Sequence, residues 1–282
     1  MPEGPEIRRA ADRLAEALVG RRLQRVVFHL PAPAGSEGRL AGARVVAVKA
    51  RSKALLTRFD NGLTLYSHNQ LYGRWEIHAG STLPPSRRQV RVVLQVRDCM
   101  AVLYSATEIA LLDEAGLDDH PYLSSLGPEL LEETTDEALV LARLSDRRWR
   151  RRALMGLLQD QKVLAGMGNY LCCEALHRAG VHPRQRPADL SPQRLRRLAG
   201  ACLALTRQSY ATGGITNELQ RAEALARQGA SFEERRFLVY RRAGRPCYGC
   251  GAPIVKARIG GQPAFFCPRC QKERSRPDGR DR

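Results

Sequence analysis

Ala54-Leu55-Leu56-Thr57-Arg58-Phe59-Asp60-Asn61-Gly62-Leu63-Thr64-Leu65-Tyr66-Ser67 is the stretch that decides the fold of the N-terminal region. Its two halves, 54–59 and 63–67, are short β-like runs, and the second alternates partly with period two. Asp60-Asn61-Gly62 between them is typical of a hairpin turn. The stretch therefore predicts two neighbouring strands joined by a tight turn.

Similar runs surround this stretch. Ile7, Ala11, Leu14 and Leu18 form one apolar stripe, which predicts a helix over 5–19 ahead of the strands. Seven strands at this spacing favour a β-sandwich or barrel. The other strand runs are 23–30, 43–50, 73–78, 90–97 and 101–105, with loops at 31–36 and 83–86.

The pattern changes after residue 105. Residues 106–134 are expected to form a looser, acidic connection. The last 40 or so residues form a short segment that is basic and contains cysteines. We therefore predict an α+β multidomain protein: an N-terminal β-sandwich domain with a flanking helix (1–130), a helical domain (131–235), a zinc-finger hairpin (236–275) and a basic tail (276–282). The predicted helices of the second part are 136–144, 150–159, 169–179, 191–209 and 217–228.

Charge points to a polyanionic partner. The 282-residue chain carries a formal net charge of +17, and nucleic acid is favoured over a membrane because the basic residues do not follow one amphipathic helix. Residues 98–142 hold eleven acids and no Lys or Arg, whereas 235–282 hold thirteen Lys or Arg and three acids. The arginine-rich segment 147–152 is either a phosphate contact or a solvated helix face. Without a membrane-spanning run or secretory signal, the protein is expected to be cytoplasmic.

Two cysteine pairs predict a metal site. Cys247 and Cys250, then Cys267 and Cys270, form a C-x2-C…C-x2-C pattern with sixteen residues between the pairs. Two such turns can converge tetrahedrally on one zinc ion, and four thiolates would leave no open position, so the ion should be structural. Residues 254–259 and 264–266, joined by Gly260-Gly261, are expected to form a hairpin. Core packing is expected for the remaining thiols, Cys99, Cys172, Cys173 and Cys202.

The first residues carry candidate chemistry. If Met1 is removed, Pro2 has a terminal secondary amine that can attack a sugar aldehyde carbon and form a cationic iminium. Glu3 and Glu6 supply carboxyl groups for proton transfer. The alternative is simply a helix start, since Pro5 suits a first turn and Glu6 suits its positive end.

Several separated segments together resemble the formamidopyrimidine-DNA glycosylase/endonuclease VIII family of base-excision repair enzymes. They are Pro2-Glu3-Gly4-Pro5-Glu6, Arg51-Ser52-Lys53-Ala54-Leu55-Leu56, 160–170 and the cysteine-bearing segment 247–271. The resemblance spans nearly the whole chain, and 160–170 is similar to the helix–two-turns–helix motif. Ser67-His68-Asn69-Gln70-Leu71-Tyr72-Gly73 is closer to the bacterial endonuclease VIII branch, which prefers oxidised pyrimidines.

The resemblance implies a bifunctional glycosylase and abasic-site lyase acting on damaged double-stranded DNA, with one structural zinc ion. It implies Pro2 as nucleophile, Glu3 as proton donor and Lys53 as the cation that binds phosphate and assists β-elimination. Glu6 and Glu174 are weaker candidates for supporting the charged intermediate. The implied DNA contacts are Gln70, Leu71 and Tyr72, which would fill the gap left by the extruded base, and Asn169, which would hold a phosphate.

Two positions depart from the family pattern. Gln262 stands where the family finger carries an Arg that grips phosphate and assists δ-elimination, and glutamine lacks the permanent charge. Because of this missing charge, β-elimination is expected to survive and δ-elimination to weaken. Arg258, on the opposite arm of the hairpin, is the candidate substitute. Ser125 replaces an Arg that often contacts DNA in this branch.

Two alternatives stay open at this point. One is the same chemistry directed at oxidised purines (8-oxoguanine and formamidopyrimidine lesions), and the other is a non-catalytic zinc-ribbon protein that binds nucleic acid. A monomer is expected, since the sequence gives no sign of oligomerisation.

Overall fold

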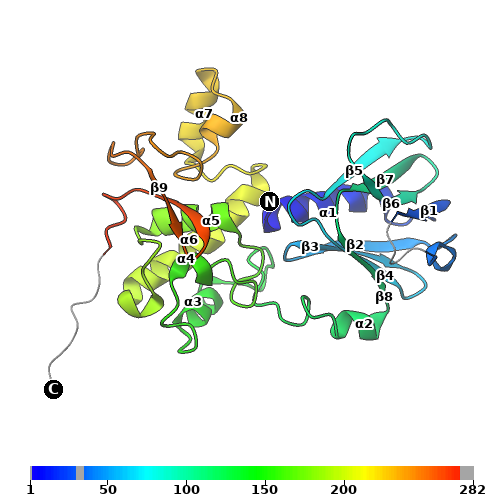
Figure 1. Ribbon diagram of the computed structural model, residues 1–282, viewed down its shortest axis with the longest axis horizontal. Helices are drawn as coiled ribbons and strands as arrows, with labels where there is room; N and C mark the ends of the chain where they lie inside the picture. Colours follow the sequence, from blue (N-terminus) through cyan, green and yellow to red (C-terminus); the bar gives the residue numbers. More distant parts are fainter. Residues whose placement is uncertain (1, 30–34, 274–282) are drawn as a thin grey trace. The chain divides into compact units, whose positions relative to one another are not determined.

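The computed structural model describes residues 2–29 and 35–273. The chain divides into two compact units, Met1–Ser125 and Leu126–Arg282 (Figure 1). The finer boundaries expected at 130 and 235 stay predictions, and the basic tail expected at 276–282 lies outside the described residues. In the described part of the chain, no helix has the length and apolarity needed to cross a bilayer.

The first unit contains two four-stranded sheets, with strand orders β1-β6-β7-β5 and β2-β3-β4-β8. Neighbouring strands are antiparallel throughout. Each of the seven predicted strands is present within about two residues of its expected bounds, so the β-sandwich prediction is confirmed. The strands are β1 (Arg25–Phe28), β2 (Val45–Arg51), β3 (Ala54–Phe59), β4 (Thr64–His68), β5 (Arg74–Ala79), β6 (Val90–Gln95), β7 (Cys99–Tyr104) and β8 (Glu108–Leu112).

Strands β3 and β4 form the hairpin that the sequence predicts. Ala54 pairs with His68 and Arg58 with Thr64, so the strands meet at the predicted turn. Gly62 has φ of 81°, a left-handed conformation that glycine adopts without steric cost. The pairing places Leu55 and Leu65 in the core of the unit.

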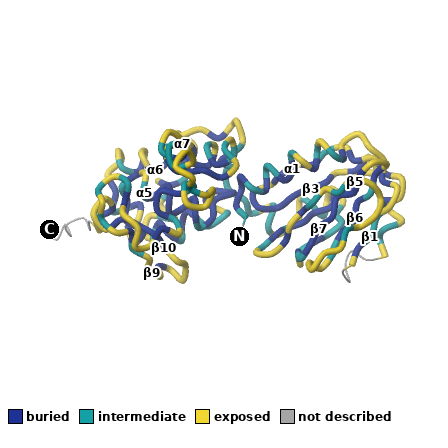
Figure 2. Tube along the Cα trace, turned by 90° about the horizontal axis from the view of Figure 1, so that it is seen from above, coloured by how far each residue is buried: buried dark blue, intermediate teal, exposed yellow. Residues whose placement is uncertain are grey.

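Helix α1 (Gly4–Leu18) covers the core of the first unit. It contacts β2 and β3 of one sheet and β5 and β7 of the other. Ile7, Ala11, Leu14 and Leu18 are each at most 2% exposed, so the predicted apolar stripe is the buried face. Figure 2 shows the buried stretches of α1 and of the inner strands in dark blue.

The structure corrects the expected loose connection over 106–134. Residues Glu108–Leu112 form β8, which pairs with β4 along five residues, and Glu114–Asp118 form the short helix α2. β8 is a half-buried edge strand in which one residue, Ile109, is buried. An edge strand with one face in solvent needs few apolar residues, so its sequence signal is weak.

The second unit is built around α5 (Asn169–Ala179), most of whose residues are buried. It packs on α6 (Pro192–Ala211) and on β10, while α3 (Glu137–Ser145) packs on α6. Gly180 ends α5 with φ of 66°, a left-handed cap. The remaining elements are α4 (Leu154–Leu157), α7 (Leu219–Arg227), α8 (Phe232–Arg235), η2 (Pro187–Asp189), β9 (Val255–Ile259) and β10 (Gln262–Phe266); η1 (Glu37–Arg39) belongs to the first unit.

The helix predicted over 150–159 is largely wrong. Its helical part is α4, and residues 147–152 form turns ahead of it. Arg148 makes an ion pair with Asp146 at 2.6 Å, and Arg152 pairs with Asp160 at 2.8 Å. The guanidinium groups of both also lie over the Trp149 ring. Two of the five arginines of the segment are thus engaged with their own neighbours, which weakens the expectation of a phosphate contact for those two.

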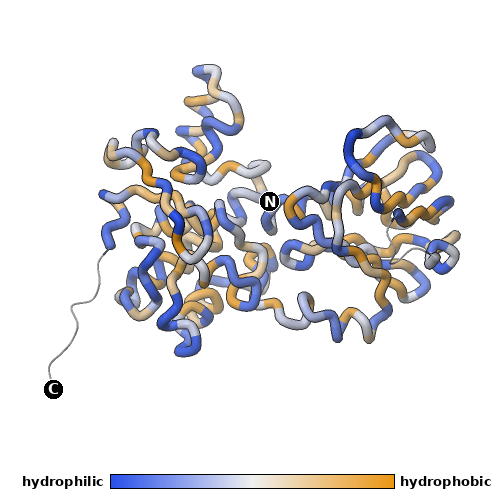
Figure 3. The backbone as a smooth tube through the Cα atoms, viewed as in Figure 1, coloured by the Kyte–Doolittle hydropathy of each residue, from blue (hydrophilic) through white to orange (hydrophobic). Residues whose placement is uncertain are grey.

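The cysteine-bearing hairpin shares one core with the helices. Phe265, Phe266 and Cys267 belong to the same buried cluster as Leu171 and Leu176 of α5. Phe265 N–H also donates to the Cys173 sulfur at 3.4 Å. The predicted core role of Cys99, Cys172, Cys173 and Cys202 is confirmed, since none is more than 9% exposed. Figure 3 shows the hydrophobic stretches concentrated along the packed strands and helices.

Candidate active site and metal centre

The N-terminal candidates lie at the start of α1. Pro2 is half-buried and Glu3 is only 2% exposed. Glu3 caps α1, and its backbone N–H donates to Glu6 Oε2 at 3.0 Å, one half of a capping box. The structural and catalytic interpretations of this segment are therefore compatible: the cap fixes the backbone immediately after Pro2.

Lys53 lies in the tight turn between β2 and β3 and is 7% exposed. Ser52 before it has φ of 59°, the left-handed conformation that a two-residue hairpin turn requires. The Tyr122 hydroxyl accepts from the Lys53 backbone N–H at 3.3 Å and donates to Ser52 Oγ at 3.0 Å. The backbone of the turn is thus tied in place and the Lys53 side chain is buried, unlike that of an ordinary strand-edge lysine.

The loop between β4 and β5 presents the expected gap-filling residues. Leu71 is 56% and Tyr72 69% exposed, which is unusual for side chains of this size. The loop is tight: Gly73 N–H donates to the Asn69 carbonyl at 2.7 Å, and a Cβ on Gly73 would lie 2.4 Å from that oxygen. Glycine at 73 thus permits a turn that leaves both side chains exposed.

Gln70 is held by residues that the sequence did not single out. Its side-chain amide donates to Glu108 Oε2 at 3.3 Å, and its Oε1 accepts from the Thr107 hydroxyl at 2.5 Å. The Tyr66 hydroxyl donates to the other Glu108 oxygen at 2.8 Å. Glu108 was assigned to a loose connection, and only the β4–β8 pairing, which sets it opposite His68, brings it here.

His68 connects the lysine turn to this loop. Its Nδ1 accepts from the Gln70 backbone N–H at 3.1 Å, and its ring packs edge-on against Tyr122 with centroids 5.3 Å apart. Burial lowers the pKa of His68; the Glu108 carboxylate opposes this shift and the Lys53 charge reinforces it. The imidazole is therefore held neutral, as the acceptor role of Nδ1 requires.

One pocket of the first unit, about 370 Å³, brings several candidates together. Pro2 and Glu6 line it from the start of α1, and Leu71 and Tyr72 line it from the β4–β5 loop. Arg88 also lines it and donates to the Tyr72 carbonyl at 3.2 Å. Glu3 and Lys53 are not among the lining residues. The pocket thus brings the candidate nucleophile and the exposed side chains of the β4–β5 loop to one place.

In the second unit, Asn169 begins α5 directly after Gly168, as expected for a helix N-terminus. Gly166, with φ of 92°, shapes the preceding turn, and its N–H donates to Gln161 Oε1 at 2.9 Å. Gln161 also donates to the Met167 carbonyl at 2.8 Å. The turn is rigidly built, and Asn169 at its end is half-buried.

Glu174 is completely buried on α5. Its carboxylate accepts from the Thr216 hydroxyl at 2.6 Å and from the backbone N–H groups of Leu238, Val239 and Tyr240 at 2.7 to 2.9 Å. Burial raises the pKa of Glu174, and these hydrogen bonds oppose that shift. The carboxylate ties two loops to α5, a structural role that an ordinary helix-face carboxylate would not have.

Arg258 and Gln262 are both exposed on the β9–β10 hairpin. Arg258 pairs with Pro263, and Gln262 pairs with Ile259. Because side chains alternate along a strand, Arg258 and Gln262 lie on opposite faces of the hairpin. In the first unit, the Ser125 hydroxyl donates to the Tyr122 carbonyl at 3.0 Å.

The four predicted ligands, Cys247, Cys250, Cys267 and Cys270, place their sulfur atoms within 4.8 Å of one another. The Cys250–Cys267 and Cys247–Cys270 sulfurs are 3.4 and 3.9 Å apart. Zn–S bonds of about 2.3 Å in a tetrahedron require sulfurs about 3.8 Å apart, so the cluster fits a metal ion. Gln271, fully buried, accepts from Cys267 N–H and donates to the Val181 carbonyl, which fixes the second cysteine turn.

Comparisons with known proteins agree along the chain. Residues 1–113 match the formamidopyrimidine-DNA glycosylase N-terminal domain, 126–221 the formamidopyrimidine-DNA glycosylase H2TH domain, and 244–272 the zinc finger found in FPG and IleRS. Endonuclease 8 of Escherichia coli is 44% identical over 271 residues, covering 96% of this chain and all of that protein. The chain belongs to the formamidopyrimidine-DNA glycosylase family.

Other family members extend this result. Endonuclease 8 of Salmonella arizonae is 43% identical over 272 residues, again 96% of this chain and all of the relative. The fold matches Lactococcus lactis formamidopyrimidine-DNA glycosylase bound to DNA containing an abasic site, with a TM-score of 0.81 at 21% identity, over 96% of this chain and 100% of that one. Members of the family are DNA glycosylases with abasic-site lyase activity, and this chain is an enzyme of that class.

Proposed function

We propose that this enzyme removes oxidised pyrimidines from double-stranded DNA and then cleaves the abasic site by β-elimination through an iminium on Pro2. The observation that carries the proposal is the pocket where Pro2 and Glu6 share walls with Leu71 and Tyr72. A nucleophile that reacts with a sugar carbon and a wedge that replaces an extruded base are needed at the same nucleotide. The identity to Endonuclease 8 relatives supports the pyrimidine preference.

The first chemical step replaces the base by Pro2. The amine lone pair forms a bond to C1′ while the glycosidic bond breaks, and the departing base takes that electron pair and a proton. Glu3, 2% exposed at the α1 cap, is the proposed proton donor, to the sugar ring or to the base. A carboxyl next to the Pro2 nitrogen in the chain is placed to act as a general acid.

The second step cleaves the strand. The Pro2 nitrogen first loses its proton, and its lone pair forms the C1′=N⁺ iminium as the C1′–O4′ bond breaks, with O4′ taking that electron pair and a proton. Loss of a C2′ proton then gives an enamine, whose electrons expel the 3′ phosphate with the electron pair of the C3′–O bond. Lys53, held in its tied turn, is proposed to bind the flanking phosphate and assist this transfer. A terminal amine has an ordinary pKa of about 7.7–8.0 and a lysine about 10.4, so Pro2 needs less adjustment to act as the nucleophile.

Contacts with DNA are proposed in both units. Leu71 and Tyr72 would fill the stack, and Gln70, fixed by Glu108 and Thr107, would hydrogen-bond the orphaned base. Asn169 at the start of α5 would hold a phosphate near the positive end of the helix. Arg258 and Gln262 are proposed backbone contacts of the hairpin.

The same proposal covers the metal, the assembly and the place of action. One zinc ion would bind Cys247, Cys250, Cys267 and Cys270 and stabilise the hairpin, without taking part in the chemistry. We propose a monomer that acts in the bacterial cytoplasm at the nucleoid, in keeping with its bacterial relatives. A non-catalytic zinc-ribbon protein no longer fits a chain that matches DNA glycosylases over its whole length.

Borohydride trapping on abasic DNA tests the nucleophile. The processed protein should form a covalent adduct, and a variant with one residue added before Pro2 should form none. A Lys53→Ala variant with a free Pro2 is the control, and it should still be trapped. An adduct that survives blocking of Pro2 would move the nucleophile to a lysine, and Met1 retained on fully active enzyme would have the same consequence.

The lesion preference has a separate test. Matched duplexes containing thymine glycol or 8-oxoguanine should be compared under single-turnover conditions. Faster release of thymine glycol is expected. Faster release of 8-oxoguanine would instead support the oxidised-purine alternative, with the same catalytic residues.

A further inference from the structure

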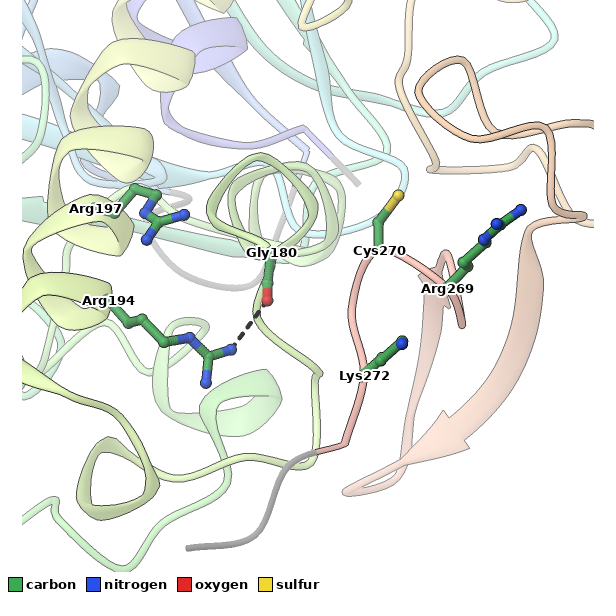
Figure 4. Close-up of a pocket in the computed structure, with 6 residues that line it drawn as sticks. All are labelled: Gly180, Arg194, Arg197, Arg269, Cys270 and Lys272. Carbon is green, nitrogen blue, oxygen red and sulfur yellow. Dashed lines mark hydrogen bonds between the residues drawn. The ribbon is translucent and has the colours of Figure 1, made fainter.

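A strongly basic cleft lies in the second unit, and none of its lining residues is assigned to the reaction. It has a volume of about 430 Å³, and its lining residues are Gly180, Arg194, Arg197, Arg269, Cys270 and Lys272. Its walls come from α6 and from the end of the zinc-finger segment, 269–272 (Figure 4). Four of the six lining residues are cations, and none is an acid.

Three of these cations have no carboxylate partner in the described part of the chain. Within residues 2–29 and 35–273, Arg197, Arg269 and Lys272 take part in no ion pair. Arg148 of the same unit, by contrast, pairs with Asp146 at 2.6 Å. Glu273 follows Lys272 in the chain but does not line the cleft. Concentrated unpaired positive charge costs repulsion and attracts an anion.

Arg194 has a different role from the other three. Its guanidinium donates to the Gly180 carbonyl at 3.0 Å and to Gln185 Oε1 at 3.1 Å. It therefore caps the C-terminal end of α5 and forms the floor of the cleft. Arg197, three residues later on the same face of α6, is exposed and has no such bond in the described chain.

The arrangement identifies the ligand by its chemistry. The lining offers no aromatic or aliphatic side chain, so a nucleobase or apolar ligand would find nothing to pack against. In Figure 4, Arg194 and Arg197 reach from α6 toward the 270–272 segment, whereas Arg269 and Lys272 extend from that segment toward the other side. The cations thus form a band and do not converge on one point, which suits an extended polyanion better than a single phosphate ion.

We propose that this cleft binds the phosphodiester backbone of DNA at phosphates other than the one proposed for Asn169. Guanidinium groups match phosphate oxygens in two-point contacts, and the lysine adds a point charge. The cleft lies at the C-terminal end of α5, and the proposed phosphate contact Asn169 lies at its start. An 11-residue helix spans about 16 Å, so the two sites contact different phosphates.

The inference rests on the proposed DNA partner but not on the proposed chemistry. A competing explanation is that Arg269 and Lys272 offset the negative charge of a zinc tetrathiolate, since Cys270 lines the same cleft. The two explanations predict different effects of removing these cations. Removing a phosphate contact changes the salt dependence of DNA affinity, whereas removing a counter-charge weakens metal retention.

The experiment measures binding of a long undamaged duplex at several salt concentrations. The zinc-loaded Arg197→Gln/Lys272→Gln variant is compared with Arg196→Gln/Arg97→Gln, which loses the same charge outside the cleft. Arg196, Arg97, Arg197 and Lys272 are all exposed. Each lost phosphate contact should flatten the slope of log affinity against log salt by about 0.9, so up to about 1.8 for the cleft variant and little for the control.

Two results would overturn the inference: equal slopes for both variants, or loss of zinc from the cleft variant with an unchanged slope. Borohydride trapping on the same preparations keeps this test separate from that of the proposed function. A wild-type protein that shows the cleft-dependent slope but no trapping would refute the chemistry and leave the cleft assignment intact.

Discussion

The Tyr122 hydroxyl accepts a hydrogen bond from the backbone N–H of Lys53, 69 residues earlier in the chain, at 3.3 Å. The same hydroxyl donates to Ser52 Oγ at 3.0 Å, so one phenol is hydrogen-bonded to both residues of the β2–β3 turn. Its ring also packs against His68, whose Nδ1 accepts from Gln70. The candidate lysine and the candidate gap-filling loop are therefore positioned by one side chain from the segment after β8.

Tyr122→Phe should separate positioning from folding. It keeps the ring contact with His68 but removes both hydrogen bonds to the turn, and it should lower the free energy of unfolding by about 1–2 kcal/mol. A displaced Lys53 should slow single-turnover cleavage of abasic DNA by about tenfold. Tyr170→Phe, which loses a hydrogen bond to Ser209 in the second unit, is the matched control and should lose stability with little effect on cleavage. Equal slowing by both variants would contradict the positioning role.

His68→Asn should reduce the pH dependence of stability. Burial lowers the pKa of His68 in the folded state below its ordinary value of 6.5. The stability from the neutral ring is therefore fully present above pH 6.5 and is lost as the pH falls through the folded pKa. Asparagine retains an acceptor for Gln70 but does not titrate. Denaturant unfolding across this range should show a smaller acid loss than in the wild type, and equal curves would refute the assignment. The groups that face His68, namely Glu108, Lys53 and Tyr122, are the same in the variant and the wild type.

Glu174→Gln should be strongly destabilising. The buried carboxylate accepts four hydrogen bonds. In glutamine, an NH₂ group replaces one carboxylate oxygen, so a hydrogen-bond donor would lie against the donors that this oxygen accepts from. We expect a loss of about 3 kcal/mol in the free energy of unfolding of the second unit. Glu223→Gln, on the exposed face of α7, is the control for the charge change and should be near neutral. Native stability in the Glu174 variant would show that the two loops are held by other contacts.

Removal of the zinc ion should destabilise the second unit. Metal analysis should give one zinc per chain, and Cys270→Ser should reduce that content and lower the unfolding temperature. The ligands Cys247 and Cys267 are part of the core that includes Leu171, so loss of the metal exposes helix packing as well as the hairpin. Cys99→Ala, in the first unit, should retain the full zinc content. A full complement of zinc in the Cys270 variant would remove it from the ligand set.

Gln262→Arg should shift the products of strand cleavage. The wild type is expected to leave mainly the β-elimination end, because glutamine cannot supply a permanent charge. An arginine at 262 should raise the share of 3′-phosphate product on a sequencing gel. Arg258→Gln tests whether the opposite face of the hairpin compensates, and the strand register leads us to expect no change. A dominant 3′-phosphate product from the wild type would contradict the expectation for Gln262.

Local patterns predicted much of this structure. The β3–β4 hairpin, α1 and α5 follow from residue periodicity and turn chemistry, because those signals belong to neighbouring residues and persist in any context. Edge strand β8 was missed because only one of its residues is buried. The helix expected over 150–159 shortened to α4, which begins where the backbone N–H groups of Leu154 and Met155 donate to the carbonyls of Gln185 and Pro183.

By itself, the sequence determined the family and singled out the four cysteines of the proposed metal site, Pro2 and Lys53 as candidates, because each lies in a short motif. Only the tertiary structure decided what holds them. Strand pairing set Glu108 opposite His68, and chain folding brought Tyr122 to Lys53 and Arg197 to the segment that carries Lys272. These partners lie tens of residues apart, and hydrogen bonds and charge act through space, so no local spacing encodes them.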